Sequence, residues 1–167
     1  MKLMTKANLE AAFAGESQAH MKYSIFADKA EREGYPEVAR LFRAIAFAEK
    51  VHATNHFRVL EGIKDTVENL GAAAGGENYE VEEMYPAFAA VADVQGEKAA
   101  AKSIHYAVEA EKIHEGMYNN AKESVKEKKD IPAAKVYVCP VCGDTHIGEP
   151  DGPCPVCGLA KEKYIVF

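Results

Sequence analysis

Two copies of a Glu-x-x-His tetrad constrain this chain more than any other feature of its sequence. They run from Glu49 to His52 and from Glu111 to His114, and they repeat at an offset of 62 residues, each 15 residues after a glycine. A three-residue spacing places both side chains of a tetrad on one face of an α-helix. Four-helix bundles that join two such faces around further carboxylates hold pairs of metal ions. The repeat therefore predicts a helical bundle with a two-metal centre.

Helical periodicity places the tetrads on buried stripes, together with carboxylates from two further helices. Glu16 lies in the middle of one further stripe, and Glu80 and Glu83 open another. Buried carboxylates cost several kcal/mol each unless they are paired, and no stripe carries a lysine or arginine at the same level. Two metal ions are the expected counter-charge, and imidazole with carboxylate suits iron or manganese. The alternative is that these groups are solvated or satisfied by local hydrogen bonds.

Composition indicates one domain with a small addition. The chain has 167 residues, of which 48% are hydrophobic, and a formal net charge of -6. The acidic balance argues against nucleic acid as a partner, because phosphate recognition needs a basic surface. No apolar run is long enough for a membrane span, and no secretory signal is recognisable at the N-terminus. We therefore expect a cytoplasmic protein without a membrane partner.

Apolar periodicity, together with glycine and proline positions, predicts four helices, at about residues 5–33, 35–62, 79–94 and 97–128. The glycine-rich stretch 63–78 between the second and third helices fits the long crossover connection of a ferritin-like bundle. Pro86 predicts a kink in the third helix. The bundle is expected to occupy residues 1–132.

The composition changes after Pro132, so residues 133–167 are expected to form a separate module with short strands. All four cysteines lie there, in two Cys-Pro-Val-Cys-Gly knuckles: Cys139, Cys142, Cys154 and Cys157. Two such knuckles form a tetrahedral thiolate site for zinc or a single iron, and spacing does not choose between them. Two disulfides are the alternative, which a reducing cytosol disfavours. With so small a core, the module needs its metal to fold.

Along nearly its whole length the chain resembles the rubrerythrins. The resemblance rests on Ala14-Gly-Glu-Ser17, Ala48-Glu49 to His52, Glu80-Val-Glu-Glu-Met-Tyr-Pro86, Glu109-Ala-Glu-Lys-Ile-His114 and the paired cysteine knuckles. It implies a mainly α fold, in which a ferritin-like four-helix bundle with a non-haem di-iron centre is followed by a rubredoxin-like domain with one iron on four cysteines. Zinc can replace iron there in recombinant material.

The resemblance also implies roles for individual residues. Glu49 and Glu111 would bridge the two irons, Glu16 would be terminal on one iron, and Glu80 and His114 would be terminal on the other. Glu83 and His52 would be alternative ligands that exchange as the redox state changes. Tyr23, two turns beyond Glu16, would donate a hydrogen bond to a ligating carboxylate.

The activity implied by the resemblance is reduction of hydrogen peroxide to water. Electrons would pass through the thiolate-bound iron from an external rubredoxin or a reductase that uses a nicotinamide cofactor, because the chain has no dinucleotide-binding fingerprint. A last helix of about 30 residues is about 45 Å long. The thiolate module at its end would then lie far from its own di-iron centre, so a head-to-tail homodimer is expected. The long connector would also permit exchange of helix pairs between subunits.

Two other functions use the same features. A ferritin-like ferroxidase or iron-storage protein, or an oxygen-reducing electron-transfer protein, would use the di-iron bundle with oxygen as oxidant. In the other reading, the cysteine module is a zinc ribbon for protein contacts and the bundle is a scaffold. An electron-relaying iron in the tail favours the peroxidase over storage.

Overall fold

A computed structural model describes all residues from 1 to 167, and the chain divides into two compact units, Met1–Lys64 and Asp65–Phe167. The first unit contains α1 (Leu3–Arg32) and α2 (Pro36–Val59). The second contains, in order, α3 (Thr66–Tyr79), η1 (Glu80–Met84), α4 (Tyr85–Gln95), α5 (Lys98–Lys126), β1 (Val136–Val138), β2 (Thr145–Ile147), η2 (Lys161–Lys163) and β3 (Ile165–Val166). The predicted class, mainly helical with a small C-terminal module of short strands, is confirmed.

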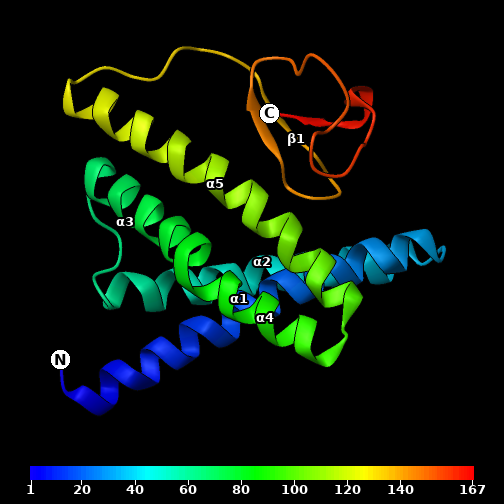
Figure 1. The fold of residues 1–167 in the computed structure, drawn as a ribbon. Helices are drawn as coiled ribbons and strands as arrows, with labels where there is room; N and C mark the ends of the chain where they lie inside the picture. The colour runs from blue at the N-terminus through cyan, green and yellow to red at the C-terminus, as the bar shows by residue number, and fades with distance from the viewer. The chain divides into compact units, whose positions relative to one another are not determined.

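The first unit is a hairpin of two long helices (Figure 1). Gly34 makes the turn with φ of 84°, a conformation that glycine adopts without strain. Pro36 then opens α2, where its missing N–H is not needed. The fully buried seam between the helices consists of alanines: Ala27, Ala30, Ala39, Ala46 and Ala53. Small side chains let the two backbones approach closely, and the larger apolar side chains lie outside this seam.

In the second unit, α3, η1 and α4 follow one another and pack along α5 (Figure 1). Gly96 ends α4 in the left-handed conformation, with φ of 71°. The expected long crossover over residues 63–78 is wrong, because α3 already begins at Thr66. Asp65 caps it, accepting a hydrogen bond from the Glu68 N–H at 2.9 Å, and three consecutive alanines offset the helix-weakening glycines.

A π-helical turn, η1, interrupts the third helix where a kink was expected near Pro86. Such turns accommodate one inserted residue in an α-helix. The sequence shows the insertion, because Gly15-Glu16 recurs as Gly76-Glu77 at an offset of 61, whereas the Glu-x-x-His tetrads and their preceding glycines recur at 62. The two halves of the chain are thus near repeats, and η1 contains the extra residue of the second half.

The C-terminal module is a three-stranded antiparallel sheet in the order β2-β1-β3, with Val138 paired to both Thr145 and Ile165. Its core is formed by the cysteines with Tyr164, and Tyr106 of α5 packs against that cluster. The module therefore lies against α5 of its own chain. The expectation that it is remote from its own helical ligands is wrong, because the chain doubles back after Lys126.

Both helical units leave large apolar side chains uncovered. Buried positions in the helices are all alanine, while Ile25, Leu41, Phe47, Phe88 and Val91 are each at least 51% exposed. So much uncovered apolar surface is unusual for a stable monomer. No helix combines the length and apolar character that crossing a bilayer requires.

We expect Asp65→Ala to destabilise the second unit by about 1 kcal/mol, because it removes the side-chain cap of α3. Thermal unfolding at fixed protomer concentration measures this. Asp65→Asn is the matched control, since asparagine also caps. Equal loss in both variants would assign the effect to charge instead of capping.

Candidate metal centres

The first unit brings together three ligand groups from its two helices, Glu16 of α1 with Glu49 and His52 of α2. Their ligand atoms all lie within 4.8 Å of one another. The Nδ1 atom of His52 lies 2.9 Å from Oε2 of Glu49 and 3.8 Å from Oε1 of Glu16. Two carboxylates and one imidazole are a donor set suited to one half of a two-metal centre, a half-site, and all three residues are ligands that the sequence predicts.

The second unit carries the corresponding group, in which Glu77, Glu111 and His114 lie within the same 4.8 Å limit. The Nδ1 atom of His114 is 2.6 Å from Oε2 of Glu111. Glu77 comes from α3 and the tetrad from α5, so two helices again supply one half-site. Each unit therefore presents two carboxylates and one imidazole that converge on a small volume.

Negative charge accumulates in the second half-site. Burial and the neighbouring charge of Glu111 raise the pKa of Glu77 from 4.5 to about 7. Burial and Glu111 also raise the pKa of Glu80. These carboxylates resist ionising together without a counter-charge. A cation held by the cluster would supply that charge, and carboxylate with imidazole is the donor set that iron and manganese accept.

Glu77 was missed from the sequence, where Glu80 and Glu83 were preferred. Glu80 lies close enough to Glu111 for their charges to interact, but Glu83 is exposed and belongs to neither ligand group. The available signal was the recurrence of Gly15-Glu16 as Gly76-Glu77, hidden by its offset of 61. The ligand roles of Glu80 and Glu83 stay predictions.

Tyr23 lies among aromatic rings in the first unit. Its ring centroid is 6.3 Å from that of Phe26 and 6.2 Å from that of Phe42. A hydrogen bond from its hydroxyl to a ligating carboxylate stays a prediction.

The four cysteines converge in the C-terminal module as free thiols. The Sγ atoms of Cys139 and Cys157 are 3.5 Å apart, and those of Cys142 and Cys154 are 3.4 Å apart. Metal–sulfur bonds of about 2.3 Å in a tetrahedron put sulfurs about 3.8 Å apart, so the cluster fits one four-coordinate ion after a small expansion. Disulfide pairing is absent.

Hydrogen bonds prepare one of these thiols for metal binding. Burial opposes ionisation of Cys154, but the Tyr164 hydroxyl and the backbone N–H groups of Val156 and Cys157 outweigh it, lowering its pKa from 9.0 to about 7. Burial raises the pKa of Cys142 and Cys157. Asp144, which is fully buried, accepts hydrogen bonds from Tyr164 at 2.5 Å and from His146 at 2.9 Å.

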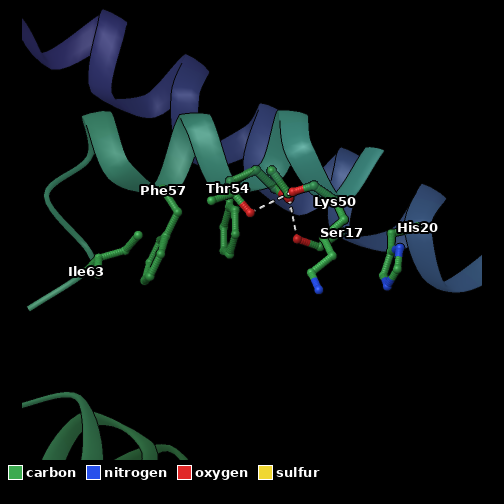
Figure 2. Close-up of a pocket in the computed structure, with 8 residues that line it drawn as sticks. Ser17, His20, Lys50, Thr54, Phe57 and Ile63 are labelled. Carbon is green, nitrogen blue, oxygen red and sulfur yellow. Dashed lines mark hydrogen bonds between the residues drawn. The ribbon is translucent and has the colours of Figure 1, made fainter. Parts of the chain in front are cut away.

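A separate hollow of about 300 Å³ opens on the α1–α2 hairpin (Figure 2). Phe13 and Phe57, whose rings stack at 4.8 Å, line it with Ser17, His20, Thr54 and Ile63. Both hydroxyls donate to carbonyls of their own helices, and Nδ1 of His20 contacts the Ala46 carbonyl at 2.8 Å. None of the metal-ligand candidates lines this hollow, so it is separate from the half-site.

Comparison with known proteins decides the family. The Rubrerythrin family model matches residues 7–122. The chain is a member of the rubrerythrin family. It is 44% identical to Rubrerythrin-2 of Clostridium acetobutylicum, with 98% of this chain and 97% of that protein covered. It is 34% identical to nigerythrin of Nitratidesulfovibrio vulgaris, with 98% and 86% covered.

Structural comparison supports the same ferritin-like assignment. The fully reduced, all-ferrous state of nigerythrin matches with a TM-score of 0.58 over 98% of this chain and 86% of that one, at 34% identity. This member of the rubrerythrin family is an iron-dependent redox protein. Its cofactors are a di-iron centre of glutamate and histidine ligands and one iron on four cysteines.

We expect the metal-free protein to lose stability as pH rises from about 4.5 to about 7. The pKa of Glu77 in the folded protein lies above its ordinary value of 4.5. The stability gained from protonated Glu77 is therefore fully present below pH 4.5 and is lost as the pH rises through about 7. Glu77→Gln should flatten the fall in melting temperature between pH 5 and 7.5. The exposed Glu83→Gln variant is the control and should keep the wild-type slope. An unchanged slope in Glu77→Gln would contradict the assignment.

Proposed function

We propose that this protein reduces hydrogen peroxide to water at a di-iron centre, using electrons relayed through the four-cysteine iron. The observation that carries the proposal is the position of the thiolate module within its own unit. A side chain of that module, Thr145, contacts the di-iron ligand candidate His114 at 2.9 Å. A short path between an electron-storing site and a two-metal site serves repeated two-electron turnover, whereas an iron store has no use for it.

The reaction consumes two electrons and two protons for each peroxide, forming two waters. A di-iron centre would supply one electron from each ion and a Lewis acid for the peroxide. The ligands would be Glu16, Glu49, His52, Glu77, Glu80, Glu111 and His114. The chain also contributes the phenol of Tyr85, whose pKa is raised by burial and by the negative charges of Glu80 and Glu111. That hydroxyl stays protonated and suits a hydrogen-bond donor beside the centre.

An external rubredoxin or NAD(P)H-dependent reductase would recharge the four-cysteine iron. The knuckle presents an apolar tip for such a partner, because Val141 is 53% exposed beside the buried Cys142. The chain has no nucleotide fingerprint of its own. Four free thiols also suit the reducing cytoplasm.

We further infer that the di-iron centre is completed by helices exchanged between two copies of the chain. In a ferritin-like bundle the second and third helices run in the same direction, so the segment that joins them must cross the length of the bundle. The 24 residues of α2 make it about 36 Å long. The connector to α3 has only six residues, 60–65, and reaches about 25 Å when fully extended.

The connector is in fact bent, since Glu61 has a left-handed φ of 58°. Its length favours exchange over a crossover within one chain. An α1–α2 hairpin from a second copy needs no crossover, and it would cover the uncovered apolar side chains while adding its Glu16, Glu49 and His52 half-site to the half-site of α3 and α5. The short connector thus supports exchange of helix pairs, whereas from the sequence we expect a long connector to permit it.

We expect the reduced protein to be oxidised much faster by hydrogen peroxide than by oxygen. Anaerobic stopped-flow absorbance measures both reactions, and loss of the ferrous four-cysteine state appears as the red ferric colour. Equal rates would instead favour an oxygen-reducing or ferroxidase function. A colourless protein with zinc on the cysteines, if it turned over at the native rate, would exclude the relay.

Helix exchange predicts complementation between two inactive variants. Glu49→Ala breaks the half-site of the first unit and Glu111→Ala that of the second. In an exchanged heterodimer, one site receives both defects and the other receives none. The isolated heterodimer should therefore have about one half of wild-type peroxidase activity, and an unfractionated random mixture about one quarter.

Differently tagged chains, co-expressed and purified through both tags, isolate the heterodimer for this measurement. Pairing two Glu49→Ala chains is the control and should restore nothing. If the mixed heterodimer is as inactive as its parents, each chain completes its own site and exchange is wrong, while the peroxide reaction itself is unaffected.

A further inference from the structure

The turn after the first cysteine knuckle rests on α5 at the half-site. Oγ1 of Thr145 lies 2.9 Å from Nε2 of His114, and Thr145 is only 7% exposed. Ala110 lies one turn of α5 before His114 and faces Gly143. A Cβ on that glycine would lie only 3.5 Å from the alanine methyl. Gly143 has φ of 86°, a conformation that glycine supplies readily. The contact is thus part of a fitted surface within the second unit.

The hydrogen bonds of Thr145 fix the direction of this contact. A threonine hydroxyl has a single proton. In this turn Oγ1 donates it to the Gly143 carbonyl at 2.8 Å. Oγ1 can then only accept from the imidazole, so Nε2 of His114 carries a proton as the donor. The remaining nitrogen, Nδ1, is the one that faces Glu111 at 2.6 Å.

We propose that Thr145 is a positioning residue for the di-iron centre, holding the His114 ring with Nδ1 directed at the metal. The proposal depends on His114 being a ligand, as in the proposed function. An imidazole ligand needs an unprotonated nitrogen facing the metal, and a hydrogen bond at the other nitrogen fixes both the tautomer and the ring orientation. Thr145 supplies that bond from the cysteine module.

The same geometry couples the two metal sites. Thr145 begins β2 and pairs with Val138 of β1, next to Cys139. The Cys139 N–H donates to the Asp144 carbonyl at 2.8 Å, closing the turn that holds both a thiolate and Thr145. Because a module with so small a core needs its metal to fold, an empty thiolate site would release Thr145. Filling the thiolate site should therefore strengthen metal binding at the carboxylate site.

The test is a Co²⁺ titration of the full-length protein, with zinc on the cysteines and the carboxylate sites emptied beforehand. Visible absorption of bound Co²⁺ reports affinity. Thr145→Val should weaken binding by about 10- to 100-fold, the range typical of lost partners of histidine ligands. Thr145→Ser keeps the hydroxyl and should bind close to wild type.

Thr54→Val is the matched control, because the Thr54 hydroxyl donates to its own helix at the Lys50 carbonyl and contacts no ligand. It should leave Co²⁺ affinity unchanged. Zinc content and thermal melting establish that each variant is folded. Wild-type affinity in Thr145→Val, or equal weakening in Thr145→Ser, would overturn the proposal.

A separate measurement tests the coupling between the two metal sites. Wild-type protein with the cysteines left empty should bind Co²⁺ at the carboxylate site more weakly than the zinc-filled protein, and equal affinity would refute the coupling. These measurements involve no peroxide. Equal oxidation by peroxide and oxygen would contradict the proposed function but not the role of Thr145. Unchanged Co²⁺ affinity in Thr145→Val would contradict the role of Thr145 but not the proposed function.

Discussion

Negative charge that the folded chain cannot leave uncompensated underlies this structure. Each helical unit gathers two carboxylates and an imidazole, and in the second unit burial and mutual repulsion raise the pKa of Glu77 to about 7. The ion pairs of Glu16, Glu49 and Glu111 are with the histidines of their own groups. Cations are the remaining means of neutralising them, and the rest of the fold is organised to deliver ligands from opposite helices to those cations.

That requirement explains a helical architecture whose interior is made of alanine. An alanine seam brings α1 and α2 close enough for Glu16 to meet Glu49, but it contributes little hydrophobic stabilisation. The large apolar side chains face outward and need a second surface. In the proposed exchanged dimer one association would cover that surface and complete the metal ligands, so stability and metal binding would depend on the same contact.

Much of this could be predicted from sequence because the signals are local. The tetrads follow from helical spacing, and the thiolate site follows from two Cys-x-x-Cys-Gly knuckles. Three features escaped such reasoning. Glycines at 71, 75 and 76 argued against a helix that its cap and packing on α5 stabilise. Glu77 was hidden by a shifted repeat, and the return of the cysteine module depends on contacts such as that between Gly143 and Ala110, which no spacing encodes.

The π-helical turn at Glu80–Met84 gives the two halves of the chain different chemistry despite their common pattern. With it, Glu80 joins Glu77 in the field of Glu111. The first half has no counterpart of this second carboxylate, because Ala19 stands 61 residues before Glu80. An ion held beside Glu77 and Glu80 would therefore face more negative charge than one held beside Glu16.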